Sequence, residues 1–266
     1  QNLFKTHDLR VQRSMKRGDG EYDGKRRKIF RFLFPVDLKC NVCDREIFSG
    51  YFCAECKNSL PYNNGTICAH CGRHIFNPEE RCFSCNGRET YFTRARSVFM
   101  YEQPVRKLIT GLKYDGKRYL AEVLAAEMAE VYYSSFFNSD IIVYPAMSAE
   151  RLKERGYNQA ELLAKELSLL IGVPVIDDVF KKVKETARQA TLDATARRAN
   201  LVGSFIVNDK AAIKDKHVLL VDDVMTTGAT AETLSRLLIK GGALSVDVLT
   251  VASVAKGIEG KINNET

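Results

Sequence analysis

The sequence predicts an α/β fold, a parallel sheet flanked by helices, with a small cysteine-rich module on its N-terminal side. Three observations support this prediction. All eight cysteines lie between residues 40 and 85. From about residue 94, short apolar segments alternate with longer amphipathic segments, as strands and helices do in α/β proteins. One of the apolar segments runs into two adjacent aspartates and a turn of small and hydroxyl residues, "VLLVDDVMTTGAT".

The composition is that of a globular protein and sets few limits on function. The 266 residues are 45% hydrophobic and 27% charged, which excludes disordered and fibrous classes. No apolar run reaches the roughly 20 residues that span a bilayer. Because the N-terminus also lacks the layout of a secretory signal, we expect a cytoplasmic protein without a membrane span. The net charge of +7 favours polyanionic partners such as phosphates and nucleic acid, but only weakly.

Changes in composition along the chain predict four parts. Residues 1–35 are basic and have little periodicity, so we expect a flexible arm. A solvated tail explains this arm better than a nucleic-acid contact does. Residues 36–92 hold the cysteines, residues 93–256 carry the α/β pattern, and residues 257–266 form a short tail.

The eight cysteines form four Cys-x-x-Cys pairs, and this spacing predicts metal binding. The pairs are Cys40 and Cys43, Cys53 and Cys56, Cys68 and Cys71, and Cys82 and Cys85. The two sulfurs of a pair can turn toward one point, and two pairs complete a tetrahedral thiolate site. Eight cysteines therefore predict two zinc ions, and disulfides are a weaker explanation because they are rare in the cytosol. A closed four-thiolate site leaves no position for a substrate, so both ions are expected to be structural.

The cysteine-rich module is also an internal repeat. "CNVCDREIFSGYFCAEC" lies over "CAHCGRHIFNPEERCFSC" at an offset of 28 to 29 residues. The matching positions include Arg45 with Arg73, Ile47 with Ile75, and Phe48 with Phe76. The repeat predicts two zinc ribbons in tandem, each with its own ion, although pairing across the halves stays open. His70 and His74 align with Val42 and Glu46, so neither histidine is an expected ligand.

The α/β part contains four expected strands and three expected helices. The strands are residues 95–101, 140–145, 217–222 and 245–254, and the helices are residues 119–133, 158–172 and 229–242. The strand segments are apolar almost throughout, which is typical of a parallel sheet covered on both faces. In such sheets ligands bind at the carboxyl ends of the strands.

The acidic couplet and the turn after it predict a phosphate-sugar site. The strand at residues 218–221 delivers Asp222 and Asp223 to the carboxyl edge of the sheet. The next residues are expected to form a tight loop before a helix that starts near Ala231; they are Met225, Thr226, Thr227, Gly228, Ala229 and Thr230. Exposed amides, threonine hydroxyls and the helix start suit one phosphate group. The two carboxylates suit the vicinal hydroxyls of a sugar or a magnesium ion that the ligand carries, so a ribose 5-phosphate compound fits.

Two alternative explanations of the acidic couplet are weaker. An apolar strand that ends in Asp-Asp also resembles a Walker B element, whose partner is a glycine-rich loop ending in Lys-Ser/Thr. The segment Gly111 to Arg118, "GLKYDGKR", ends in Arg instead and follows a helical stretch, so we discount it. Asp222 and Asp223 could otherwise be turn or capping residues.

The motif "VLLVDDVMTTGAT" resembles the phosphoribosyl pyrophosphate (PRPP) signature of type I phosphoribosyltransferases over all thirteen positions. "LKYDGKRYLAEVLA", "YPAMSAERLKERGYNQAELLAKEL" and "ETARQATLDATARRANLVGSF" resemble the competence protein F (ComF) family. Its members join a double zinc ribbon to a phosphoribosyltransferase-like domain. The resemblance covers roughly residues 38–254. It departs at residues 144–147, "YPAM", where the family usually has Val or Ile, then Pro and Leu or Met.

The resemblance implies further site residues. Residues Ala146 to Arg151 match the loop that holds pyrophosphate in this fold. The PRPP-binding residues that the resemblance implies in this segment and the helix after it are Ala146, Met147, Ser148, Arg151 and Arg155. The two arginines lie four residues apart and would share a helix face. A solvated basic helix face without a ligand explains them as well as phosphate binding does. The segment Lys181 to Arg198 matches a mobile lid, and an ordinary exposed connection is nearly as good an explanation. Gln189 and Asn200 match the family pattern without an assigned role.

Two functions follow from the resemblance. One is a PRPP-binding accessory protein for DNA uptake in natural transformation, with single-stranded DNA and a competence helicase as partners. The other is an active, magnesium-dependent phosphoribosyltransferase, in which Asp222 and Asp223 would be catalytic by compensating the charge of a cation-like ribose. No acceptor site and no oligomeric state follow from the sequence. Ammonia release from glutamine, as in the purine-pathway amidotransferase, needs a glutaminase domain with a nucleophilic cysteine. It is excluded here because every cysteine is assigned to zinc.

Overall fold

The computed structural model describes residues 38–75, 81–82, 85–87, 90–183 and 203–254. The predicted arm at residues 1–35 and the tail at residues 257–266 lie outside the described residues, as does most of the predicted lid, including Gln189 and Asn200. The chain divides into two compact units, Gln1–Leu60 and Pro61–Thr266. The first cysteine quartet therefore belongs to the first unit and the second quartet to the second. Within the described residues, no helix is both long and apolar enough to cross a bilayer.

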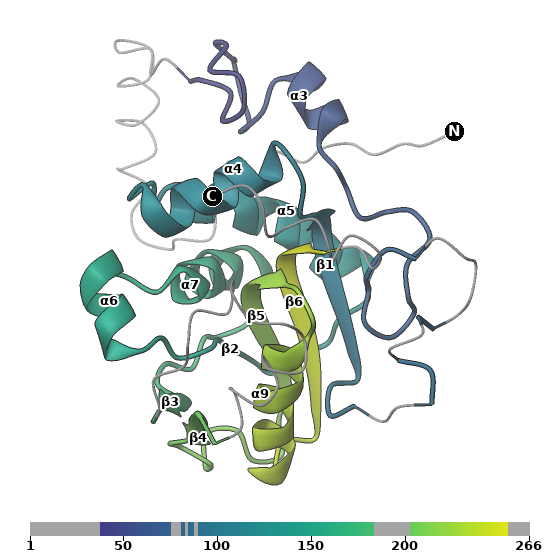
Figure 1. The fold of residues 1–266 in the computed structure, drawn as a ribbon, viewed down its shortest axis with the longest axis vertical. Helices are drawn as coiled ribbons and strands as arrows, with labels where there is room; N and C mark the ends of the chain where they lie inside the picture. The colour runs from purple at the N-terminus through teal and green to yellow at the C-terminus, as the bar shows by residue number, and fades with distance from the viewer. Residues whose placement is uncertain (1–37, 76–80, 83–84, 88–89, 184–202, 255–266) are drawn as a thin grey trace, which may run out of the picture. The chain divides into compact units, whose positions relative to one another are not determined.

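Four parallel strands form the sheet of the second unit in the order β1-β6-β5-β2 (Figure 1). Their bounds are β1 Arg94–Met100, β2 Ile141–Val143, β5 His217–Met225 and β6 Ser245–Ser253. The two central strands, β5 and β6, are buried along most of their length, because helices cover both faces of the sheet. The prediction of a parallel sheet is confirmed.

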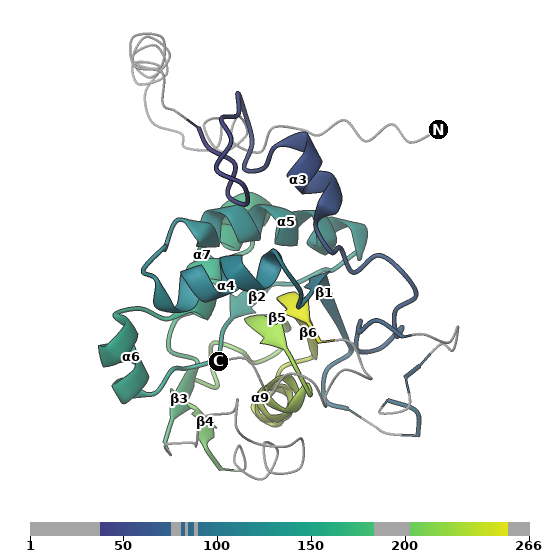
Figure 2. The same cartoon turned by 45° about the horizontal axis from the view of Figure 1, so that its top comes forward.

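Helices cover the sheet on two sides. The longer helices of the second unit are α4 Val105–Tyr114, α5 Leu120–Ser134, α7 Gln159–Ile171 and α9 Ala229–Lys240, and α6 Ala149–Arg155 is short. The short helix α3 Ala54–Ser59 belongs to the first unit. Helices α5 and α7 lie on one face of the sheet, and α9 lies on the opposite face (Figures 1 and 2). Helix α4 packs on α5. Each of the three predicted helices is present.

Three details differ from the expectations. Strand β5 does not end before the acidic couplet but continues to Met225, because β6 pairs with it as far as Ser253. The loop before α9 is therefore only Thr226 to Gly228, and α9 starts at Ala229, where the predicted helical segment of residues 229–242 begins, and not near Ala231. Lys181 and Lys182 of the predicted lid lie in a short strand, β3 (Phe180–Lys182), which pairs antiparallel with β4 (Phe205–Val207).

The second zinc knuckle, residues 68–85, is built into the body of the second unit. Its four cysteines are buried and belong to the same apolar core as residues of β5, β6 and α9. The Ala95 amide of β1 donates to the His70 carbonyl at 2.8 Å. Gly72 turns the knuckle with φ +64°, and a Cβ there would lie 2.3 Å from the Ala95 carbonyl oxygen. The matching residue of the first knuckle is Asp44, also with positive φ. Only glycine lets the second knuckle approach β1 this closely.

Candidate functional site

The candidate site lies at the carboxyl edge of the sheet. Strand β2 ends at Val143, which is in register with Leu220, whereas β5 extends beyond it through Asp222 and Asp223. The start of α7 connects this extension to the loop after β2. Asn158 caps α7 and donates through Nδ2 to the Pro145 carbonyl at 2.9 Å, and the next residue, Gln159, donates through Nε2 to Asp223 Oδ2 at 3.4 Å. The loop after β2 and the acidic couplet of β5 are therefore both anchored to the start of α7.

Asp223 is buried, and its carboxylate is held by the chain itself. Its Oδ2 atom forms an ion pair with Lys113 Nζ from α4, and its Oδ1 atom accepts from the Val224 amide at 2.7 Å. Burial opposes ionisation, but the Lys113 ammonium and its hydrogen bond hold the pKa of Asp223 below its usual value. Burial likewise opposes the charge on Lys113, and the Asp223 carboxylate raises the Lys113 pKa. The pair is therefore charged at neutral pH.

Asp222 is the more accessible carboxyl group of the couplet. Its Oδ1 atom accepts from the Asp223 amide at 2.8 Å. Burial of the carboxyl, followed by the negative charge of Asp223, raises the pKa of Asp222 to about 8. The couplet thus combines a fixed carboxylate with a carboxyl group that can hold a proton at neutral pH. Such a pair can both accept hydrogen bonds from hydroxyl groups and adjust its charge when a cation approaches.

The loop from Thr226 to Gly228 exposes donors for an anion. Gly228 has φ +80° and is the N-cap of α9, a conformation that glycine adopts without strain. Within the described residues, the amides of Thr226, Thr227 and Gly228 have no backbone acceptor, whereas the Ala229 amide donates to Thr227 Oγ1 at 3.3 Å. Unpaired amides at the start of a 12-residue helix favour a phosphate or another anion. Met225 is different, since it is a buried strand residue whose carbonyl accepts from the Val254 amide at 3.1 Å.

The structure brings one of the two predicted arginines to this network. Arg155 of α6 donates through Nη1 to Gln159 Oε1, the same side chain that contacts Asp223. Its guanidinium also lies over the Tyr114 ring, 4.9 Å from the centroid. Arg151 does share the helix with Arg155, but among the described residues its side chain has no contact with the acidic couplet. Ala146 and Met147 are half-buried residues of the loop after β2, and buried Ser148 caps α6 by accepting from the Arg151 amide at 3.4 Å.

Two residues of the network were not predicted from the sequence, Lys113 and Gln159. Lys113 follows Ile109 by four positions and so continues the buried face of α4, which contains Val105, Leu108, Ile109 and Leu112. A lysine at such a position is a signal for a buried partner. Gln159 is the first residue of α7, and nothing in its local sequence marks it.

The cysteines form two separate quartets, each suited to one zinc ion. Cys40, Cys43, Cys53 and Cys56 form one group, and Cys68, Cys71, Cys82 and Cys85 form the other, with the sulfurs of each group within 4.8 Å of one another. All eight thiols are free of disulfides. The pairing is therefore sequential within each half of the repeat and not crossed, and four thiolates match a closed tetrahedral site. His70 belongs to neither group; its ring stacks on Phe92 at 4.8 Å.

The sheet, the acidic couplet and the loop before α9 define a phosphoribosyltransferase-type domain, which in this chain follows a double zinc ribbon. A family model described as a phosphoribosyl transferase domain matches residues 122–265, and one described as a double zinc ribbon domain matches residues 29–86. The chain belongs to the competence protein F family.

Competence protein F of Haemophilus influenzae is 32% identical over 228 residues, which are 81% of this chain and 97% of that protein. The DNA utilization protein YhgH of Salmonella typhimurium is 28% identical over 223 residues, again 81% of this chain and 97% of the relative. Among solved structures, the glutamine PRPP amidotransferase of B. subtilis, complexed with ADP and GMP, is similar over 49% of this chain and 25% of its own. Its sequence identity is 19% and its TM-score is 0.33.

Proposed function

We propose that the protein binds PRPP with magnesium at the carboxyl edge of its sheet and serves as a cytoplasmic accessory factor in DNA uptake during natural transformation. The observation that supports this ligand is the acidic couplet of β5 next to a loop whose amides have no backbone acceptor in the described part of the chain. The names of the relatives, a competence protein and a DNA utilization protein, support the biological role.

Each part of the ligand has a matching group in the site. The 5-phosphate would bind the amides of Thr226 to Gly228 and the hydroxyl of Thr230. Because Lys113 and Gln159 already occupy Oδ2 of Asp223, the more accessible Asp222 would take most of the contact with the ribose hydroxyls. The pyrophosphate would lie against the loop of residues 146–148, with Arg155 nearby. Magnesium, when bound with the ligand, would neutralise pyrophosphate charge.

A second candidate function is catalytic transfer of ribose 5-phosphate from PRPP to an acceptor of unknown identity. The observation that favours it is the Lys113–Asp223 pair, which keeps a carboxylate ionised in a buried position. Because the Lys113 ammonium offsets the charge on Asp223 Oδ2, the cation-like ribose formed when the bond to pyrophosphate breaks would be stabilised by Asp223 Oδ1 and by Asp222 once it is ionised. Release of pyrophosphate that depends on an added nucleophile would establish this activity.

The test of ligand binding is calorimetric titration with PRPP and magnesium. The wild-type chain should bind, and Asp222→Ala/Asp223→Ala should lose binding. A matched control is Glu130→Ala, which removes an exposed carboxylate of α5 and should bind as the wild type does. Equal binding by wild type and the double variant would place the ligand elsewhere and overturn the proposed site.

The test of the DNA role is the salt dependence of single-strand binding. A protein that contacts several phosphates loses affinity steeply as salt rises, because binding releases counterions. The full chain, including residues 1–37, should therefore bind single-stranded DNA at low salt and release it as salt increases. A chain that binds no single strand at low salt, and no competence helicase, would contradict a direct role in DNA handling.

A further inference from the structure

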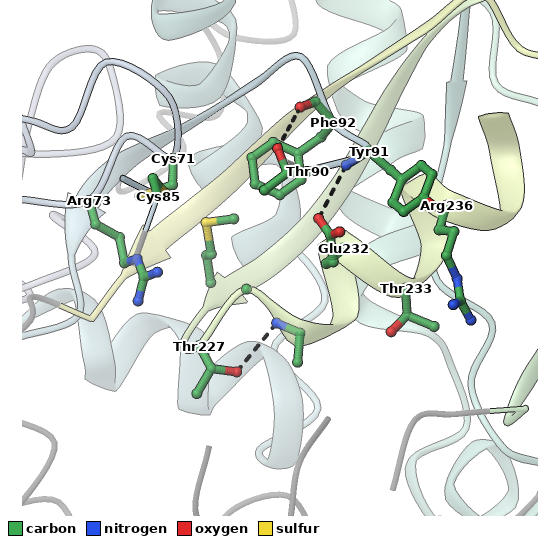
Figure 3. A pocket seen from close by; sticks show the side chains of 13 residues that line it. Cys71, Arg73, Cys85, Thr90, Tyr91, Phe92, Thr227, Glu232, Thr233 and Arg236 are labelled. Carbon is green, nitrogen blue, oxygen red and sulfur yellow. Dashed lines mark hydrogen bonds between the residues drawn. The ribbon is translucent and has the colours of Figure 1, made fainter. Parts of the chain in front are cut away.

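A cavity of about 220 Å³ lies beside the start of α9 in the second unit (Figure 3). The second zinc knuckle forms one wall, through Arg73 and two of its cysteines. The loop before α9 forms the opposite wall, through Thr227 and Gly228, and an acidic and a basic residue, Glu232 and Arg236, continue this wall along the helix. The knuckle thus shares a cavity with the loop that we assign to phosphate.

Arg73 is the unusual residue of this cavity. Its side chain extends from the knuckle toward the loop (Figure 3), yet only 4% of the residue is exposed. Nη1 donates to the Thr226 carbonyl at 3.2 Å, whereas Nε is buried and has no hydrogen-bond partner among the described residues. The sulfurs of Cys71, Cys82 and Cys85 already supply negative charge beside the guanidinium. What Arg73 lacks is an acceptor for Nε, and a buried donor without an acceptor is costly, so this arrangement leaves one donor available to a further oxygen ligand.

The opposite wall offers the complementary half of an anion site. The amides of Thr227 and Gly228 lack backbone acceptors within the described residues, and they stand at the positive end of α9. An anion in the cavity could accept hydrogen bonds from these amides and from the guanidinium on the other side. A planar guanidinium matches the geometry of phosphate oxygens.

The internal repeat shows that the knuckle itself does not require a buried arginine. Arg45 occupies the matching position of the first knuckle, and its side chain is 63% exposed and pairs with Glu55 at 2.9 Å. The two knuckles have the same cysteine spacing, apart from one additional residue in the second, but only the second turns this arginine toward a phosphate-type loop. A knuckle of this kind therefore folds without a buried arginine at this position, and the contact of Arg73 with the Thr226 carbonyl is specific to the second knuckle.

We propose that Arg73 is a phosphate-binding residue supplied by the second zinc knuckle, and that the sugar phosphate binds between its guanidinium and the amides of Thr227 and Gly228. This inference rests on the proposed function, and it gives the second zinc ion a task beyond folding. Because Arg73 lies two residues from Cys71, a zinc ion bound in that quartet would fix the start of the arginine side chain.

Calorimetry with two fragments of PRPP tests the inference. Ribose 5-phosphate carries the phosphate without pyrophosphate, and magnesium pyrophosphate carries no sugar phosphate. Arg73→Ala should weaken ribose 5-phosphate binding roughly 10- to 100-fold, the usual effect of a lost charged hydrogen bond, and leave magnesium pyrophosphate binding unchanged. Arg73→Lys should restore part of the affinity, and Arg45→Ala should bind both fragments as the wild type does. Metal analysis should find two zinc ions per chain in each variant.

Different results overturn different statements. If zinc-loaded Arg73→Ala binds ribose 5-phosphate like the wild type, Arg73 is not a phosphate ligand and the proposed function stands. If Arg73→Ala weakens both fragments equally and Arg73→Lys restores neither, the arginine is only structural. Should Arg73→Ala fail to retain zinc, Arg73→Lys decides alone, since unchanged affinity for ribose 5-phosphate would refute the guanidinium contact. If the wild-type chain binds neither ribose 5-phosphate nor PRPP, the proposed function itself fails.

Discussion

The ammonium group of Lys113 in α4 is paired with the carboxylate of Asp223 in β5, at the point where the sheet meets its candidate ligand. Both side chains are largely buried, with 19% and 8% of their surface exposed. The pair occupies one oxygen of the acidic couplet before any ligand arrives. The pair therefore fixes Asp223 as an anion and leaves Asp222 as the carboxyl group that can lose a proton when a ligand binds.

Replacement of Lys113 by methionine should destabilise the second unit. The change leaves Asp223 buried without its cation, and loss of one partner of a buried pair costs about 3–5 kcal/mol of unfolding free energy. Urea denaturation in the presence of zinc measures the effect. The control is Lys165→Met, which removes a more exposed lysine paired with Glu161 and should change stability by under about 1 kcal/mol. A double variant, Lys113→Met/Asp223→Leu, should recover most of the lost stability. If Lys113→Met and the control Lys165→Met change the unfolding free energy equally, the Lys113–Asp223 pair does not behave as a buried pair.

The pKa of Asp222 predicts how stability depends on pH. The folded state holds a proton on this carboxyl up to about pH 8, whereas the unfolded chain releases it near 3.8. The stabilisation that comes from this bound proton is complete below the pKa of Asp222 in the unfolded chain, and it is lost as pH rises toward the pKa of Asp222 in the folded state. Asp222→Asn removes this loss, so its stability relative to the wild type should increase from pH 5 to pH 8 by at most about 1.4 kcal/mol per unit and then level off.

Urea denaturation of both zinc-loaded chains between pH 5 and pH 9 measures this difference. Other titrating groups, including the zinc thiols, are common to both chains and cancel. A difference that stays constant over the whole range would show that Asp222 is already ionised in the folded state at pH 5.

Local sequence patterns were sufficient for some parts of the site and insufficient for others. The cysteine spacing predicted both metal quartets, and the apolar run before Asp222 predicted a buried strand, because these signals lie within a few residues of one another. The predicted end of β5 was wrong, because the length of this strand depends on its pairing with β6 as far as Ser253. Lys113 and Arg73 were missed as site residues for the same reason, since each meets its partner only after distant segments pack.

Gly72 should be intolerant of any side chain. Its φ of +64° alone costs alanine about 1–2 kcal/mol, and a Cβ would also lie 2.3 Å from the Ala95 carbonyl oxygen. We therefore expect Gly72→Ala to lower the unfolding free energy by about 3 kcal/mol or more, with the knuckle displaced from β1. Gly87→Ala is the matched control, because it has φ +67° and no described atom within 4 Å of the added Cβ. Equal effects of both substitutions would show that β1 does not restrict Gly72.

The two zinc quartets should differ in what they stabilise. Cys68, Cys71, Cys82 and Cys85 lie in the same core as Leu234 of α9 and Val246 of β6, so loss of their ion removes packing from the sheet domain. Cys40 belongs to the other compact unit. Cys68→Ser should therefore lower the Tm of the sheet domain by more than about 10 °C, at about 2–4 °C for each kcal/mol lost, and weaken PRPP binding.

The matched variant for this comparison is Cys40→Ser, which substitutes the corresponding cysteine of the first knuckle. It should also lose one zinc ion per chain by metal analysis, but it should keep the main thermal transition and the affinity for PRPP, because the second unit retains its own quartet. A drop in the main transition as large as that of Cys68→Ser would mean that the two units unfold together. Unchanged stability in Cys68→Ser, with its zinc gone, would mean that the core of the second unit holds the knuckle in place without metal.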